Sequence, residues 1–150
     1  MDLENLQPNL TTYNTGIIQA RAYRALRITI STALKKYNLT MSEWALLGTI
    51  HDKRYVRYSE LAGVLEVKPP LVTKIIDGLI IKELVSSVKD KEDKRSKLLT
   101  ETSKASALVP QIELDVRTKT RNLIKEISSD ELITYVKVLK ALAENLKDVK

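Results

Sequence analysis

The chain has 150 residues, of which 43% are hydrophobic, 29% are charged and 5% are aromatic. This length and apolar share suit one compact domain with a real core, and the low glycine and proline content excludes collagen-like, low-complexity and largely disordered chains. Twenty-five Lys and Arg residues against nineteen Asp and Glu give a net charge of +6. That charge favours a polyanionic partner or an anionic membrane surface, although many basic proteins bind neither.

Several classes of function are excluded by the residues that the sequence lacks. There is no cysteine, so disulfides, thiolate catalysis and thiol-based redox sensing are ruled out. The single histidine, His51, leaves no cluster for a structural zinc and no Ser-His-Asp constellation elsewhere in the chain. We therefore expect no metal, no cofactor and no enzymatic activity.

The sequence shows no sign of membrane insertion or export. No apolar run approaches the ~18 residues of a membrane span. Residues 1–16 include Asp2, Glu4 and Pro8 and lack the basic-then-apolar pattern of a signal peptide. We therefore expect a cytoplasmic protein without membrane contact.

The first predicted helix runs from about Ile17 to Tyr37. Its apolar residues recur at spacings of three and four, the pattern of one helical stripe: Ile17, Ala20, Tyr23, Leu26, Ile30, Ala33 and Leu34. Such a stripe must be buried in the core or against a partner chain.

A second helix is predicted to begin sharply after Thr40. Thr40 and Glu43 have the spacing of a capping box, in which each side chain accepts a hydrogen bond from the other residue's backbone amide. Leu39 and Trp44 have the spacing of a hydrophobic staple around that cap. The helical pattern fades after His51.

Two short helices separated by a turn are predicted next. The first covers Ser59 to Leu65, and the second begins at Pro69 and Pro70, because proline is tolerated in a first turn whose amides lack helical partners. The predicted core face of the second helix is Val72, Ile75, Ile76 and Leu79, and its polar face holds Thr73, Lys74 and Asp77.

Beyond Leu84 the pattern changes to two short strands, 85–88 and 97–100, around the charged loop 90–96. This arrangement predicts a hairpin whose tip projects into solvent and whose strands pack against the preceding helices.

The rest of the chain returns to helix. A helix from Thr102 towards Lys125 should be kinked or broken by Pro110. Ser128 and Glu131 repeat the capping box. They precede a last helix with a long apolar stripe: Leu132, Tyr135, Val136, Leu139, Leu142 and Leu146.

Helix, turn, helix and a hairpin with a basic tip form the order of a winged helix-turn-helix. The chain resembles the MarR (multiple antibiotic resistance regulator) family at Leu39-Thr40, Leu46-Leu47, Leu61-Ala62, residues 72–77 with Leu79, Asp93-Lys94-Arg95 and Thr102. The resemblance implies a mostly α fold in one domain, 1–150. In this fold the winged helix-turn-helix would span 39–102, and the helices of 1–38 and 103–150 would form a dimerisation region.

Four residues depart from the family's pattern. Lys68 stands where a Ser or Thr usually caps the recognition helix, and Glu83 takes the place of a glycine. Ser87 replaces a common arginine, and Glu101 replaces an apolar residue. These departures put a capping bond, the strand pairing and some backbone contacts in question, but not the fold.

The resemblance implies a transcriptional regulator that binds double-stranded DNA by sequence. We expect a homodimer, acting as a repressor, on a pseudo-palindromic operator. The helix 69–82 would enter the major groove, and Arg95, oriented by Asp93, would enter the minor groove, where narrow A·T-rich stretches concentrate negative potential. The plainer interpretation of Asp93 and Arg95 is an exposed ion pair worth under ~1 kcal/mol.

The remaining candidate DNA contacts are basic or exposed residues of three segments: Lys68, Pro70, Leu71, Thr73 and Lys74 on the recognition helix; Lys91, Lys94 and Lys97 on the wing; and Arg54 and Arg57 before the first short helix. Lysines near phosphates add salt-dependent affinity that is blind to sequence. Each segment also has a plainer interpretation. The recognition helix has an ordinary solvated face, the wing lysines belong to a solvated charged loop, and Arg54 and Arg57 only make a turn soluble.

The resemblance also implies a pocket for a small aromatic or phenolic effector, with Tyr23, Tyr37, Trp44 and His51 as candidates. The plainer interpretation packs Trp44 in the staple and leaves His51 in solvent at a helix end.

Two other functions remain open at this stage. A winged-helix protein-interaction module would show a shallow salt dependence on any DNA. An architectural protein would bind every duplex equally, with a steep salt dependence.

Overall fold

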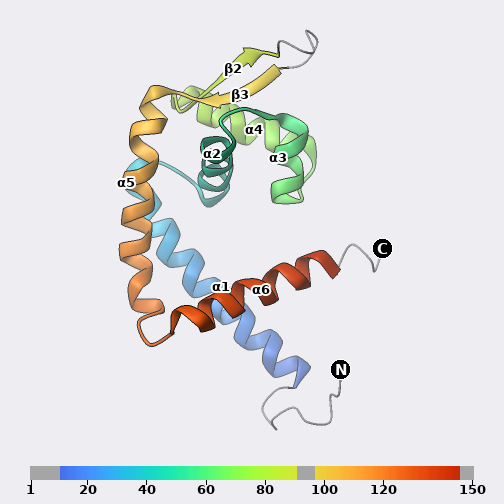
Figure 1. The fold of residues 1–150 in the computed structure, drawn as a ribbon, viewed down its shortest axis with the longest axis vertical. Helices are drawn as coiled ribbons and strands as arrows, with labels where there is room; N and C mark the ends of the chain where they lie inside the picture. Colours follow the sequence, from blue (N-terminus) through green and yellow to red (C-terminus); the bar gives the residue numbers. More distant parts are fainter. Residues whose placement is uncertain (1–10, 91–96, 146–150) are drawn as a thin grey trace. The chain divides into compact units, whose positions relative to one another are not determined.

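The computed structural model describes residues 11–90 and 97–145, which form two compact units, one ending at Thr120 and the other beginning at Arg121. The described residues are mostly helical, with a small antiparallel sheet (Figure 1). The predicted fold class, a mostly α winged helix-turn-helix, is confirmed. In the described part of the chain, no helix combines the length and the apolar character that crossing a membrane requires.

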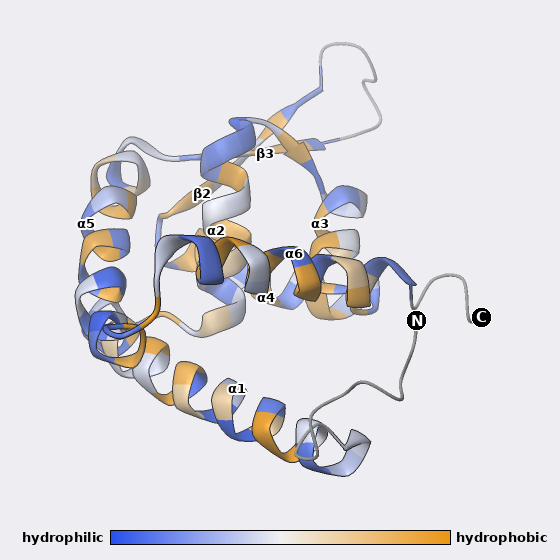
Figure 2. Cartoon of the chain, turned by 60° about the horizontal axis from the view of Figure 1, so that its bottom comes forward, coloured by the Kyte–Doolittle hydropathy of each residue, from blue (hydrophilic) through white to orange (hydrophobic). Residues whose placement is uncertain are grey.

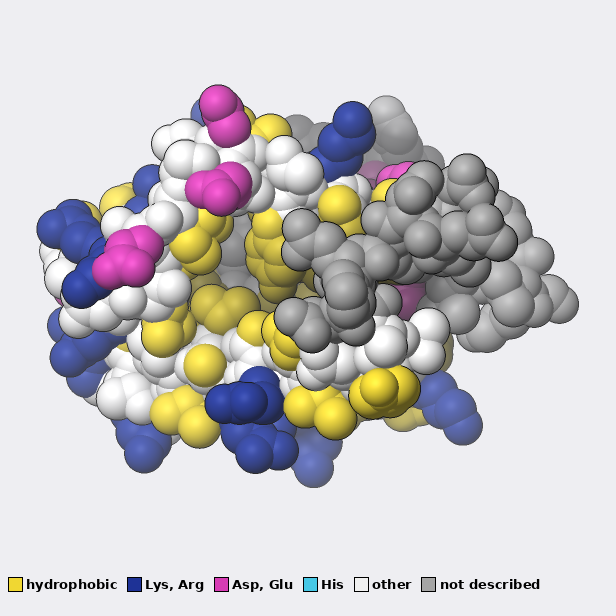
Figure 3. Space-filling model, turned by 90° about the horizontal axis from the view of Figure 1, so that it is seen from below, with side chains coloured by type: hydrophobic (Ala, Val, Ile, Leu, Met, Phe, Trp, Pro, Cys, Tyr) yellow, Lys and Arg dark blue, Asp and Glu magenta, His cyan; other side chains and the backbone are white. Residues whose placement is uncertain are grey.

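The first helix, α1 (Thr12–Leu34), begins earlier than predicted and continues as the 3₁₀ turn η2 (Lys35–Tyr37). It starts at Thr12 because Thr11 caps it: the Thr11 hydroxyl accepts from the Asn14 amide at 3.3 Å. Only Ala33 and Leu34 of its stripe are buried in this chain. Along the rest of α1 apolar and hydrophilic residues alternate (Figure 2), and hydrophobic side chains lie exposed between Lys and Arg side chains on the surface (Figure 3).

The helix α2 (Met41–Lys53) has the predicted capping box. The Glu43 amide donates to the Thr40 hydroxyl at 3.1 Å, and the Thr40 amide donates to the Glu43 carboxylate at 2.8 Å. Its buried residues Leu46, Leu47 and Ile50 lie at the centre of the larger unit's core.

The two short helices are α3 (Tyr58–Leu65) and α4 (Pro69–Ile81). Both prolines occupy the first turn of α4, as predicted, and Lys68 at the N-cap makes no side-chain capping bond. The buried face of α4 is Val72, Ile76 and Leu79, with Ile75 partly buried against the same core.

The predicted hairpin is β2 (Val85–Lys89) and β3 (Lys97–Glu101), and a strand that the sequence did not predict, β1 (Val56–Arg57), pairs with the other edge of β3. The departures from the family's pattern do not disturb this pairing. Ser87 lies opposite Leu99, and Glu101 lies opposite Val85.

Of the predicted kink or break at Pro110, the break is wrong, because the helix α5 (Ser103–Thr120) continues through Pro110. Thr102 begins α5 by accepting a hydrogen bond from the Ala105 amide at 3.2 Å. Pro110 and Ser106, four residues before it, are both exposed. Water can therefore bond the carbonyl that the proline ring leaves without an amide partner.

The smaller unit contains the 3₁₀ turn η3 (Arg121–Leu123) and the helix α6 (Ser129–Asn145). The second predicted capping box is present. The Ser128 amide donates to the Glu131 carboxylate at 2.8 Å, and the Glu131 amide donates to the Ser128 hydroxyl at 3.3 Å. No residue of α6 is buried, although its apolar stripe is prominent (Figure 2).

Candidate nucleic-acid interface

The helix pair α3 and α4 buries Leu61 with Val72 and Ile76 and turns the opposite face of α4 outward. The exposed residues of α4 are Pro69, Pro70, Leu71, Thr73, Lys74, Asp77, Ile80 and Ile81. All four recognition-helix candidates on α4 are therefore on its outer face, and Lys68, just before the helix, is also exposed.

Hydrogen bonds from Lys82 connect the end of α4 to the beginning of α2. The Lys82 ammonium donates to the Asn38 carbonyl at 2.6 Å and to the two Glu43 carboxylate oxygens at 2.7 and 2.8 Å. Gly78 permits this approach, because a Cβ there would lie 2.9 Å from Glu43 Oε1. This contact fixes α4 relative to the core helix beneath it.

Glu43 is the buried member of this cluster, with 7% of its surface exposed. Burial raises the pKa of the Glu43 carboxyl, but the Lys82 ammonium and the Thr40 amide outweigh burial and hold that pKa below its usual value. Glu43 therefore remains ionised beside Lys82 at neutral pH.

An ion pair between Arg57 and Asp90 stabilises the base of the wing. Arg57 Nη2 lies 2.8 Å from Asp90 Oδ2, and Asp90 is 5% exposed. The Arg57 backbone amide also donates to the Glu60 carboxylate at 2.8 Å, at the start of α3. Arg57, a predicted phosphate contact, thus links β1, α3 and the end of β2.

Of the wing residues, Lys97 is exposed and lies opposite Lys89 in the last described pair of the hairpin. Lys91, Asp93, Lys94 and Arg95 lie outside the described residues.

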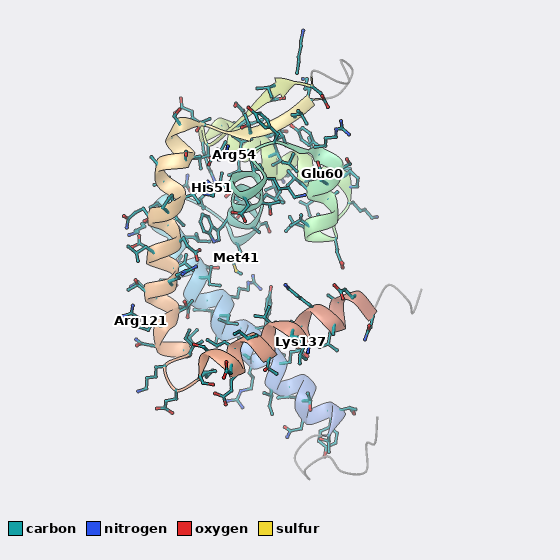
Figure 4. The ribbon with its side chains drawn as sticks, viewed as in Figure 1. Met41, His51, Arg54, Glu60, Arg121 and Lys137 are labelled. Carbon is teal, nitrogen blue, oxygen red and sulfur yellow. The ribbon has the colours of Figure 1, made fainter. Side chains whose placement is uncertain are left out.

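Arg54 ends α2 with a positive φ of 65° and is exposed. Figure 4 marks Met41 and Arg54 near the two ends of α2, with Glu60 on the neighbouring α3.

The four effector candidates differ in their bonding partners and in their exposure. The Tyr37 hydroxyl donates to Asp115 on α5, and the neighbouring Lys36 ammonium contacts the same carboxylate. His51 is half-buried, and its Nδ1 lies 2.7 Å from Glu101 Oε2 on β3, so His51 is not simply solvated at a helix end. Trp44 is half-buried against the core, and Tyr23 is 60% exposed.

The Tyr37 cluster shifts the pKa values of its members. Burial, followed by the bond to Asp115, raises the pKa of the Tyr37 hydroxyl. The Lys36 ammonium and then the Tyr37 hydroxyl lower the pKa of Asp115. These bonds join η2, which follows α1, to α5.

The sequence did not predict the two ion pairs that hold the interface in place, Lys82–Glu43 and Arg57–Asp90. Lys82 and Glu43 are 39 positions apart, and Arg57 and Asp90 are 33 apart. No local spacing signals pairs this distant. A third distant contact did have a sequence clue: Glu101 is acidic where the resembled family has an apolar residue, and it is the partner of His51.

The comparisons with known proteins agree with this geometry. The MarR family model matches residues 39–97, the segment from the residue before Thr40 to the first residue of β3. The resemblance to the MarR family is confirmed. Within this MarR-like winged helix, α3 and α4 form the helix-turn-helix and β2 and β3 form the wing.

Solved structures with similar folds cover nearly all of this chain. A mutant MarR from E. coli complexed with operator DNA is 23% identical, with a TM-score of 0.75, over 85% of this chain and 91% of that one. A MarR-family transcriptional regulator from Rhodococcus sp. RHA1 is 17% identical, with a TM-score of 0.79, over 91% and 96%. BpsR of Bordetella bronchiseptica, whose DNA binding is regulated by 6-hydroxynicotinic acid, is 18% identical, with a TM-score of 0.76, over 92% and 96%.

Proposed function

We propose that this chain is a transcriptional repressor that binds double-stranded DNA by sequence, as a homodimer on a pseudo-palindromic operator. The observation that carries the proposal is α4, whose outer face is exposed while Lys82 and Glu43 fix its inner side. The family match over residues 39–97 supports the same function.

In this proposal α4 lies in the major groove, which is about 12 Å wide and admits one helix. Pro70, Leu71, Thr73 and Lys74 face the bases, because they occupy the exposed first turns of the helix. Lys68 and Arg54 contact phosphates and add affinity that falls as salt rises.

The wing enters the neighbouring minor groove with Arg95, which Asp93 orients. Lys91, Lys94 and Lys97 lie near the phosphates on either side. The Arg57–Asp90 pair holds the base of the hairpin, and the half-exposed Arg57 side chain is a further phosphate contact.

The proposed dimer is formed by helices near the two ends of the chain. Exposed apolar side chains on α1 include Ile17, Ile18 and Ile28, and α6 exposes Ile133 and Val136. Pairing two copies through such faces would place the two recognition helices one DNA turn, about 34 Å, apart.

We also propose that a small aromatic or phenolic compound releases the repressor, with Tyr23, Tyr37, Trp44 and His51 as its contacts. The similarity to BpsR supports this regulation. Adding a series of phenolic and pyridine carboxylic acids should lower operator affinity for at least one member. If none changes operator affinity, this part of the proposal is wrong.

The test of the proposed function is Arg95→Ala on the DNA sequence that the protein selects. Loss of the minor-groove contact should weaken binding at least tenfold and leave the helical circular dichroism unchanged. The control is Arg117→Ala, which removes the same charge from an exposed position on α5. Equal affinities for the two variants would show that the wing does not contribute to DNA binding.

A further inference from the structure

The recognition helix has few side chains that can read bases by hydrogen bonds. Residues 69–81 contain one cation, Lys74, one anion, Asp77, and one hydroxyl, Thr73, with no Arg, Asn, Gln or Ser. Arginine or lysine on guanine and asparagine or glutamine on adenine are the usual paired contacts in the major groove. Of these side chains, α4 carries only Lys74.

The one hydroxyl is engaged within the helix. Thr73 Oγ1 donates to the Pro69 carbonyl at 3.2 Å, the residue four positions earlier. The hydroxyl proton is therefore used inside α4, although the oxygen can still accept. What the exposed Thr73 adds to the outer surface is mainly its methyl group.

The first turn of α4 places further apolar surface beside Thr73. Pro70 is exposed, and Leu71 is 47% exposed despite its place at the start of a helix with a well-formed buried face. The first turns of a recognition helix are the part that approaches base edges. In the major groove, the apolar group on a base edge is the 5-methyl of thymine.

We propose that α4 reads its half-site chiefly by thymine methyl groups, through Leu71, Pro70 and the methyl of Thr73, with Lys74 as the one donor directed at a base. This inference rests on the proposed function and names the bases that the same helix selects. The half-site should contain thymines where α4 enters the groove, on either strand.

The experiment uses the inverted-repeat duplex that the full chain selects from random DNA. Each thymine of one half-site is replaced in turn by deoxyuridine, which removes the methyl group and keeps every hydrogen-bonding atom. We expect Kd to rise about fourfold at each contacted thymine, the effect of one buried methyl. Thymines outside the α4 footprint should show no change.

Leu71→Ala separates direct contact from an effect of the methyl on DNA shape. At the position that Leu71 contacts, this variant should bind the thymine and deoxyuridine duplexes with nearly equal Kd. The matched control is Val64→Ala on α3, which removes a side chain of similar exposure, 46%, and should keep the full discrimination.

The outcomes distinguish the inference from the function on which it rests. A selected site that is bound specifically but tolerates deoxyuridine at every position would overturn thymine reading and leave the proposed function intact. Equal discrimination by Leu71→Ala and the wild type would overturn the role of Leu71. No preferred duplex at all would overturn the proposed function and, with it, this inference.

Discussion

At the scale of single residues, four positions other than glycine adopt left-handed backbone among the described residues: Asn38, Arg54, Glu66 and Glu83. Each lies at or just after the end of a helix. Glycine is the usual residue there because it has no Cβ to clash in this conformation. The chain has only four glycines, so side-chain-bearing residues end these helices at a cost in stability.

Replacing Glu83 by glycine should therefore stabilise the protein. Its φ of 59° suits glycine, and its carboxylate makes only an exposed ion pair with Lys104. Glu83→Gly should raise the free energy of unfolding by about 0.5–1 kcal/mol in urea denaturation. Glu83→Ala, which keeps the Cβ and removes the charge, should give no such gain. The same gain in both variants would show that the stabilisation comes from removing the charge and not from the backbone conformation.

The pairing of Glu43 with Lys82 should appear in the pH dependence of stability. Glu43→Gln should cost about 1–3 kcal/mol at pH 7, because the half-buried Lys82 ammonium loses its carboxylate. The folded-state pKa of Glu43 lies below its ordinary 4.5, so the contribution is complete above pH 4.5. It is lost as pH falls through the folded value, and wild type and variant should therefore converge in acid.

Glu60→Gln is the control for that comparison. Glu60 also caps a helix, α3, but its side chain is 45% exposed, so its removal should cost less than about 1 kcal/mol. If the two variants lose equal stability at pH 7, the Lys82 contact is not what stabilises the start of α2.

At the scale of elements, the structure differs most from expectation where a local rule competes with packing. Pro110 lies in the interior of α5, yet the helix is uninterrupted because Ala105, Val109, Ile112 and Val116 bury its inner face on both sides of the proline. Packing on the core thus outweighs the missing backbone hydrogen bond.

Pro110→Ala should consequently stabilise α5. Proline costs about 3 kcal/mol in a helix interior relative to alanine, partly offset by the stiffness it gives the unfolded chain. We expect a net gain of about 1–2 kcal/mol, measured by urea denaturation. Gln111→Ala at the adjacent exposed position is the control and should change stability by less than about 0.5 kcal/mol. A loss of stability in Pro110→Ala would mean that the ring itself packs favourably.

The elements that could be predicted from the sequence are those whose signals are local. The Thr40–Glu43 and Ser128–Glu131 boxes and the prolines of α4 mark helix starts within a few residues. The strand β1 was missed, because two residues are too short to show alternation and depend on pairing with β3.

The same division applies to the candidate interface. The polar face of α4 follows from its 3.6-residue period, so Thr73 and Lys74 could be placed from the sequence, whereas Leu71 was a candidate through the family resemblance. Two ion pairs hold this interface in place, Lys82–Glu43 and Arg57–Asp90. They join distant segments and therefore depend on the tertiary fold.

At the scale of the whole molecule, each of the two units has a helix with a largely exposed apolar face. The stripe of α1 is exposed over most of its length, and α6 has no buried residue. Leaving such surface in water is unfavourable, and a second copy of the chain would cover it.

We therefore predict that the protein sediments at twice its 17.0 kDa chain mass at micromolar concentration. Val136→Lys, which places a charge on the apolar stripe of α6, should yield monomers and weaken operator binding at least tenfold. Thr134→Lys adds the same charge beside that stripe and should remain dimeric. A stable monomer for the wild type would contradict the dimer.

Recognition of DNA by sequence can be measured with the purified protein in a single experiment. The purified protein is used to select genomic fragments, and its affinity for the best duplex is titrated against a scrambled duplex over a range of salt concentrations. We expect an inverted repeat to be bound about 10³-fold or more tightly than the scrambled sequence, with an affinity that falls steeply as salt rises. Equal binding of the two duplexes at every salt concentration would contradict it.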